Sequence, residues 1–388
     1  MSDGGFISDY LAYNSFNWFP QNFHRAMAHV LVGLAVGRRA WATDGPWPIY
    51  PLSHCIMVAD SGVGKGAAVE MMSRVQRKAL PSLAVARKEG SAAGILKRLP
   101  LSDDRGKQVA PLLIEAGEMT TLLNRMEHLG NLVSVLTELA DNNRYGKSLR
   151  DEFIEIEDIQ TSIVLGTNEK ALREHFTASI IETGLASRFT WLTAGWATKP
   201  LDRVPDSDPQ VQAAFQAAVG RLREVSSSRG EWTLDAPAAA WFRSWQEGND
   251  QGPPPDRTLS GYWSRRYIRL LQVALVSALS RGSVSNGLID LADMEYAWGW
   301  VQDTERQMNE AFGSLRLSGY GQVETQVEEW LAARPDGANW TEACREWSGR
   351  MAGKESVRRV LDSLVASGRV TVGRTKGGGE RFRKAEAN

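Results

Sequence analysis

Short apolar runs that alternate with helical patterns limit the fold of this 388-residue chain more than any other feature of its sequence. In chain order the apolar runs read CIMVA, SLAVA, PLLIEA, SIVLGT and FTWLTAGW, and the helical patterns between them include AAVEMMSRVQRKAL, SAAGILKRL and LGNLVSVLTELADNN. Strands that are buried on both faces read as continuous apolar runs, and a helix between successive strands allows them to run parallel. The sequence therefore predicts an α/β fold with a mostly parallel sheet that is covered by helices on both faces.

The pattern changes along the chain and predicts four segments. Residues 1–45 form a helical lead-in with Pro20 in the first turn of a helix, and residues 46–200 form the core that contains the sheet. After the linker TKPLDRVPDSDPQ, residues 201–318 form a mostly helical lid region. Residues 319–388 contain three helical patterns and two short extended runs around a glycine turn, which together predict a winged-helix domain.

Composition and charge exclude several classes of protein. The formal net charge is −1, so the whole chain is not a polycation, and any contact with nucleic acid requires a local basic patch. The two cysteines form no CxxC motif, which argues against a disulfide scaffold or a structural zinc site and fits a reducing cytoplasm. The first residues lack the pattern of a secretory signal, and the apolar run AMAHVLVGLAVG is too short to span a bilayer. We therefore expect a cytoplasmic protein that does not enter a membrane.

The stretch MVADSGVGKGAA is the strongest candidate for a ligand site. It follows the phosphate-binding pattern G-x-x-x-x-G-K-[ST], except that Ala59 replaces the first glycine and Gly66 replaces the hydroxyl residue. A strand is expected before it and a helix after it, so that backbone N–H groups at the start of the helix can face an anion. The alternative is a glycine turn with a solvated lysine. If the loop binds a nucleotide, the residues that contact it are Ser61, Gly62, Val63, Gly64, Lys65, Gly66 and Ala67.

Three later positions could complete an ATPase site. Glu115 and Glu118 end an apolar strand, where paired carboxylates favour a bound cation, although solvated glutamates at an exposed strand end are the alternative. Asn168 ends another strand and could position water against a γ-phosphate, or it could cap a helix. Arg188 precedes the last strand of the core and could stabilise charge on a transferring phosphoryl group, or it could form a surface ion pair.

The order of these features resembles a known family. The chain is similar to the AAA+-related, superfamily-3-helicase-like P-loop ATPases of phages, plasmids and integrated elements, many of which are described only as primase–helicase-like or as domains of unknown function. The resemblance spans residues 19–312 and rests on FPQNFHRAMAHVLVGLAVGRR, ADSGVGKGAA, EGSAAGILKRL, LLIEAGEMTTLL, LTELADNNR, LGTNEKAL, GLASRF and RRYIRLLQVALVSAL. It implies an additional-strand P-loop core that binds ATP and Mg²⁺ in a homo-oligomer such as a hexameric ring.

The resemblance also implies roles for individual residues. These are phosphate contact for Lys65, catalysis for Glu118, sensing for Asn168, and an arginine finger supplied to the neighbouring subunit for Arg188. The aspartate that holds Mg²⁺ in the family directly precedes the glutamate, and here that position is Gly117. Glu115 could take its place, so Glu115 and Glu118 are the candidate Mg²⁺ ligands.

The C-terminal segment has the features of a nucleic-acid-binding module. Its third helix, KESVRRVLDSLVASG, carries two adjacent arginines beside an apolar stripe, and its hairpin carries a series of basic residues around KGGGE. Such a helix can lie in a major groove of DNA while a basic wing contacts phosphates. A protein-binding winged helix and a solvated basic tail are the alternatives. The candidate contact residues are Arg358, Arg359, Arg374, Lys376, Arg381 and Arg383.

Three functions are consistent with these features. The first is an ATP-driven motor or switch on single- or double-stranded DNA, a helicase or an initiator in the replication of a mobile genetic element. The second is an assembly protein that binds DNA and uses nucleotide to join subunits, with little or no hydrolysis, as Gly66 and Gly117 would permit. The third, a small-molecule phosphotransferase, fits poorly with the winged-helix segment.

Overall fold

The computed structural model divides into two compact units. The larger unit ends at Ala311 and the smaller one contains the residues from Phe312 onward, together with residues 255–258, which lie outside the described ranges. The structure describes residues 5–44, 47–87, 92–101, 107–119, 129–141, 145–148, 153–175, 184–196, 205–249, 260–282, 286–316, 319–351, 353–366, 369–374 and 379–385.

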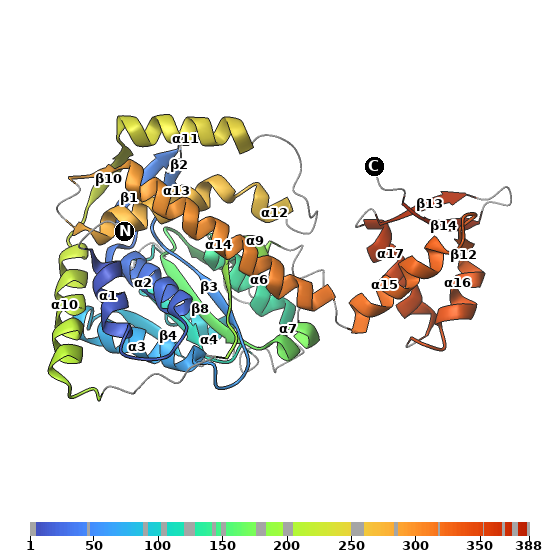
Figure 1. Ribbon diagram of the computed structural model, residues 1–388, viewed down its shortest axis with the longest axis horizontal. Helices are drawn as coiled ribbons and strands as arrows, with labels where there is room; N and C mark the ends of the chain where they lie inside the picture. Colours follow the sequence, from blue (N-terminus) through green and yellow to red (C-terminus); the bar gives the residue numbers. More distant parts are fainter. Residues whose placement is uncertain are drawn as a thin grey trace. The chain divides into compact units, whose positions relative to one another are not determined.

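A five-stranded parallel sheet lies at the centre of the larger unit (Figure 1). Its strands have the order β4-β5-β8-β3-β9, so that β8 lies between β3 and β5. The register places Ile56 beside Leu165 and Ile114 beside Ile163. The strands are β3 (Cys55–Val58), β4 (Ala84–Arg87), β5 (Leu112–Ala116), β8 (Thr161–Thr167) and β9 (Thr190–Thr193). The prediction of an α/β fold with a parallel sheet is confirmed.

Helices cover both faces of this sheet, which explains why its strands read as continuous apolar runs. Met57 and Val164 belong to the same apolar core as α2 and α3. Their chain neighbours Ile56 and Ile163 point to the opposite face and are also fully buried. On that face, Thr161 donates a hydrogen bond to the carbonyl of Leu139 in α6. The helices are α2 (Gln21–Val36), α3 (Lys65–Ala79), α4 (Ala92–Leu96), α6 (Leu129–Ala140), α7 (Glu169–His175) and α9 (Leu185–Arg188).

The lead-in is part of the larger unit rather than a separate layer. Helix α1 (Phe6–Asn14) packs on α2 and on α10 (Pro209–Val225), and α2 in turn contacts α3, α10, α13 and β8. Almost every side chain of α2 is buried. Its apolar sequence therefore suits a helix that lies between the sheet and later helices.

A second, smaller sheet joins segments that are far apart in the sequence. Its order is β11-β10-β1-β2, and β1 pairs in parallel with β10, with Ala42 opposite Trp232. The strands are β1 (Ala40–Asp44), β2 (Trp47–Ile49), β10 (Gly230–Leu234) and β11 (Leu288–Ile289). The lead-in and the region after residue 200 are therefore connected by backbone hydrogen bonds, which sequence patterns did not reveal.

The remaining elements of the larger unit are mainly helical. Helix α13 is the strongly amphipathic segment RYIRLLQVALVSALS and packs on α2 and α10. His29 of α2 contacts the hydroxyl of Tyr296 in α14, with 2.7 Å between its Nε2 and the phenolic oxygen. These elements are β6 (Tyr145–Ser148), β7 (Phe153–Ile156), α11 (Ala236–Asn249), α12 (Ser260–Trp263), α13 (Arg266–Ser280) and α14 (Leu291–Arg316).

In its described residues, the smaller unit contains the end of α14, three further helices and a three-stranded antiparallel sheet of order β12-β14-β13. Its core is formed by the apolar stripe of α17, which includes Val360 and Leu361, together with Trp347 and Phe382. The elements are α15 (Gly319–Ala332), β12 (Ala338–Asn339), α16 (Trp340–Trp347), α17 (Lys354–Ala366), β13 (Val370–Arg374) and β14 (Glu380–Lys384). Among the described helices of both units, none combines the length and the apolar character needed to cross a membrane.

Candidate functional site

The loop between β3 and α3 is built around two glycines in left-handed conformations. Gly62 has φ 91° and Gly64 has φ 114°, a region that residues with a Cβ atom rarely adopt. Helix α3 begins at Lys65, and no side chain caps its first turn. The backbone N–H groups at this helix start are therefore available to an anion, at the carboxyl edge of the sheet where open α/β sheets bind ligands.

Lys65 lies folded onto the loop and is 4% exposed. Its ammonium donates hydrogen bonds to the carbonyl oxygens of Ala59 at 2.6 Å and Asp60 at 3.1 Å. The Nζ atom is also 3.9 Å from Oε1 of Glu118. Burial lowers the pKa of Lys65, and the negative charges of Glu118 and Asp60 oppose this change. The described contacts therefore place a positive charge at the mouth of the loop, with a carboxylate beside it.

A close backbone contact positions Glu118. After β5, the chain passes over Gly166 of β8, where a Cβ atom would lie 2.2 Å from the carbonyl oxygen of Gly117. The backbone N–H of Met119 also donates to the carbonyl of Gly166 at 2.6 Å. Because Gly166 has no side chain, the end of β5 can approach β8 closely and place Glu118 beside Lys65.

Glu115 points to a different set of partners. Its carboxylate is buried and accepts hydrogen bonds from Arg87 of β4 and, at 3.3 Å, from the hydroxyl of Ser73 in α3. Arg87 also donates to the Ser73 hydroxyl at 3.1 Å. The structure thus places Glu118 beside Lys65, and Glu115 beside Arg87 and Ser73.

Asn168 lies at the carboxyl end of β8 and caps the helix that follows. Its side-chain oxygen accepts a hydrogen bond from the backbone N–H of Ala171 at 2.9 Å. Helix capping was the alternative to the sensor role, and this hydrogen bond agrees with capping. The capped position keeps Asn168 at the same edge of the sheet as the loop.

Arg188 is held by an intramolecular ion pair and is 14% exposed. It donates two hydrogen bonds to Asp141, at 2.7 and 2.6 Å, and one to the carbonyl of Gly184 at 2.8 Å. Arg265 also donates to Asp141, at 2.8 Å. Burial acts to raise the pKa of Asp141, but hydrogen bonds from the two arginines outweigh it and hold that pKa below its usual value. Sequence reasoning identified Arg188 and missed Arg265, because the shared carboxylate is distant in the chain.

Two aromatic rings contact the glycine loop. A Cβ atom on Gly62 would lie 2.6 Å from Cη2 of Trp196, and one on Gly64 would lie 2.5 Å from Cδ1 of Phe19. Trp196 follows β9 and Phe19 precedes α2, so the two rings come from segments that are distant from the loop in the sequence. Sequence reasoning did not assign these rings to the site.

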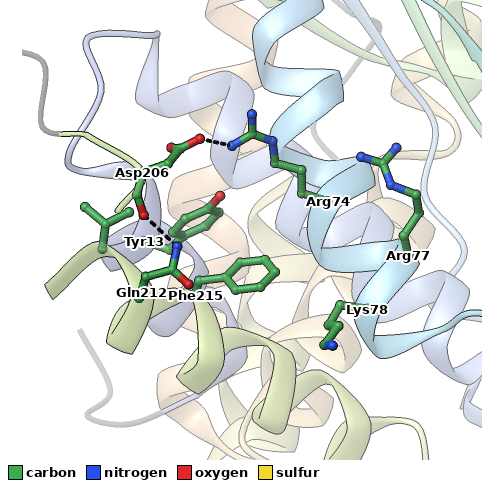
Figure 2. A pocket seen from close by; sticks show the side chains of 8 residues that line it. Tyr13, Arg74, Arg77, Lys78, Asp206, Gln212 and Phe215 are labelled. Carbon is green, nitrogen blue, oxygen red and sulfur yellow. Dashed lines mark hydrogen bonds and ion pairs between the residues drawn. The ribbon is translucent and has the colours of Figure 1, made fainter. Parts of the chain in front are cut away.

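A separate pocket of about 360 Å³ lies beside the carboxyl-terminal half of α3 (Figure 2). Arg74 donates to Asp206 across its rim at 2.7 Å. The lining residues are Tyr13, Arg74, Arg77, Lys78, Asp206, Val211, Gln212 and Phe215. None of the predicted ATPase residues lines it, so pocket size does not locate the candidate site.

Mg²⁺ requires few protein ligands when phosphates are present. Within the described ranges, no group of three or more His, Cys, Asp or Glu side chains is arranged to hold a metal ion. Mg²⁺ typically uses one or two carboxylates together with phosphate oxygens and water. Glu118, placed beside the loop, has the donor chemistry for such a ligand.

The basic residues of the smaller unit differ in how they are held. Arg358 of α17 donates to Glu380 of β14 and pairs with Asp362 at 3.0 Å. Arg359 is strongly exposed and lies 3.9 Å from Glu355. Arg374 and Arg383 are exposed on the hairpin, Arg381 donates to the carbonyl of Asp336 at 3.2 Å, and Lys376 lies outside the described residues.

Comparisons with known proteins add no family assignment. No protein-family model matches the chain, and no curated protein matches it.

Proposed function

We propose that this chain is an AAA+-like P-loop ATPase that binds ATP with Mg²⁺ and acts as a motor or switch on DNA. The observation that carries the proposal is the placement of Lys65 on an uncapped helix start, 3.9 Å from Glu118. A cationic amine, backbone N–H groups and a carboxylate at one edge of a parallel sheet are the groups that phosphoryl chemistry needs.

The order of the strands supports the same proposal. Strand β8, which Asn168 follows directly, lies between the loop strand β3 and the carboxylate strand β5. This is the position that the resemblance to additional-strand P-loop ATPases leads us to expect. Mg²⁺ would be held by Glu118 and phosphate oxygens, and it would neutralise charge on the phosphates.

The smaller unit supports the DNA-acting part of the proposal. Its three helices and its antiparallel sheet follow one another as expected for a winged helix, with α17 in the place of the DNA-reading helix. Arg359, Arg374 and Arg383 supply exposed positive charge for contacts with phosphates. The resemblance makes replication of a mobile genetic element the natural process, with helicase or initiator activity.

ATP turnover with two variants tests the core of this proposal. We expect Lys65→Ala to weaken ATP binding strongly, because the phosphate-binding ammonium is lost. We expect Glu118→Gln to keep ATP binding and to lose at least about 100-fold in turnover, as general acid–base catalysis typically contributes that much. Steady-state ATPase assays with and without single-stranded and duplex DNA, combined with calorimetry of ATP binding, measure both effects. Wild-type protein that binds no nucleoside triphosphate would refute the proposal.

One observation favours a second candidate, nucleotide-dependent assembly on DNA with little or no hydrolysis. Glu115 is engaged by Arg87 and Ser73, and neither Gly66 nor Gly117 offers a side chain to Mg²⁺. Tight ATP binding without turnover, together with a change in mass on ATP addition, would support this candidate. In either case a homo-oligomer such as a hexameric ring would let Arg188 reach a neighbouring site, after it leaves Asp141.

A further inference from the structure

Trp196 is a large apolar side chain left in solvent beside the glycine loop. It is 60% exposed, whereas most of the large apolar side chains in the described residues are buried. It follows β9, the strand next to β3, so it leaves the sheet at the same carboxyl edge as the loop. An exposed indole at this edge is available to a ligand that already lies on the loop.

The loop is shaped to accept this ring. Gly62 has φ 91°, and a Cβ atom there would lie 2.6 Å from Cη2 of Trp196. The glycine therefore serves two purposes: it permits the left-handed backbone and it allows the indole edge to touch the loop. The indole of Trp196 therefore lies directly against the backbone of the loop that we propose binds phosphate.

The chain that carries Trp196 is anchored just before it. The carbonyl of Thr193 accepts a hydrogen bond from Asn22 at 2.9 Å, and its N–H donates to Gln307 at 3.0 Å. Its hydroxyl donates to Glu310 at 2.6 Å. These bonds join the end of β9 to the start of α2 and to α14, so Trp196 extends from a fixed point.

A second ring lies on the other glycine of the loop. Phe19 contacts the position of Gly64, and its ring centroid is 4.8 Å from that of Trp18. The loop thus combines charge at Lys65 with aromatic surface contributed by two separate segments.

We propose that Trp196 is the stacking surface for the base of a nucleoside triphosphate whose phosphates lie on the loop, and this inference rests on the proposed function. A nucleotide joins a polyanion to a planar aromatic group, which matches an ammonium and an exposed indole that both contact this loop. Stacking accepts any base because every base has a π-face, so Trp196 adds affinity with little selectivity among bases.

Binding of ATP and of inorganic tripolyphosphate, measured by calorimetry on the full chain, separates base recognition from phosphate recognition. We expect Trp196→Ala to raise the Kd for ATP about tenfold, from the loss of one stacked base, and to leave the Kd for tripolyphosphate unchanged. Trp196→Phe should recover most of the ATP affinity. Trp47→Ala is the matched control, since Trp47 is 73% exposed on β2 and contributes no ring to the loop.

Each other outcome overturns the inference in a recognisable way. Equal losses for ATP and tripolyphosphate would make Trp196 a support for the loop, and no loss for either would leave it without a role in binding. If the wild-type protein binds neither probe, the proposed function fails and this inference fails with it. Thermal unfolding of each variant, followed by circular dichroism, checks that the fold is intact.

Discussion

At the scale of single residues, two glycines near the candidate site differ in the space around them. A Cβ atom on Gly166 would lie 2.2 Å from the backbone oxygen of Gly117, which cannot move aside as the end of a flexible side chain can. A Cβ atom on Gly66 would meet nothing within 4 Å. Gly66 lacks the hydroxyl expected in a phosphate loop, yet the site has room for one.

We therefore expect opposite effects from one substitution at the two positions. Gly166→Ala should lower the free energy of unfolding by about 1–3 kcal/mol, the usual cost of overpacking, and should displace Glu118 from Lys65. Gly66→Ala lies in a helix with open space and should change stability by less than about 1 kcal/mol, in the stabilising direction. Urea unfolding of both variants measures the difference. Equal stabilities would show that the β5–β8 contact is not as close as described.

At the scale of elements, α2 is a buried helix that carries titratable groups. His24 and His29 lie within it and are shielded from water, and burial lowers the pKa of His24 to about 4 and that of His29 to about 3. His54, just before β3, is also buried, and burial is the largest cause that lowers its pKa to about 3. The helix that supports the sheet is thus packed with neutral imidazoles.

This packing predicts that the larger unit loses stability in mild acid. The unfolded chain protonates its histidines near pH 6.5, while the folded chain resists protonation down to about pH 3–4. The buried neutral histidines therefore do not lower the free energy of unfolding above pH 6.5. As the pH falls below 6.5, the free energy of unfolding decreases, by about 2 kcal/mol per histidine at pH 5. Urea unfolding of wild type and His29→Gln at pH 7.5 and pH 5 tests this. If the variant loses as much stability between these pH values as wild type, the burial of His29 does not cause the effect.

The elements also indicate which features of the fold and the site can be predicted from the sequence. The loop strand, the helix after it and the place of Glu118 just after a strand follow from local patterns, because each depends on residues close in the chain. The approach of Glu118 to Lys65 depends on Gly166, which is distant in the chain. The pairing of β1 with β10 and the contacts of Glu115 with Arg87 depend on residues that are distant in sequence. Such contacts are decided by tertiary packing, so a strand-end carboxylate could be recognised without its partner.

At the scale of the whole molecule, the net charge of −1 means that any DNA binding must come from an uneven distribution of charge. The smaller unit carries exposed arginines, but they are not equivalent. The charge of Arg358 is neutralised by Glu380 and Asp362. Its neighbour on α17, Arg359, has a longer ion-pair distance of 3.9 Å to Glu355. The two arginines form a matched pair with the same charge on the same helix.

We expect Arg359→Ala to weaken DNA binding and to reduce the slope of log affinity against log salt by about 1, because one phosphate contact is lost. Arg358→Ala should leave that slope nearly unchanged, because its charge is already balanced within the unit. Fluorescence anisotropy of a labelled duplex at increasing KCl, with the full chain and each variant, measures both slopes. Equal effects of the two substitutions would mean that total charge governs binding, and binding independent of salt would remove the smaller unit from the DNA interface.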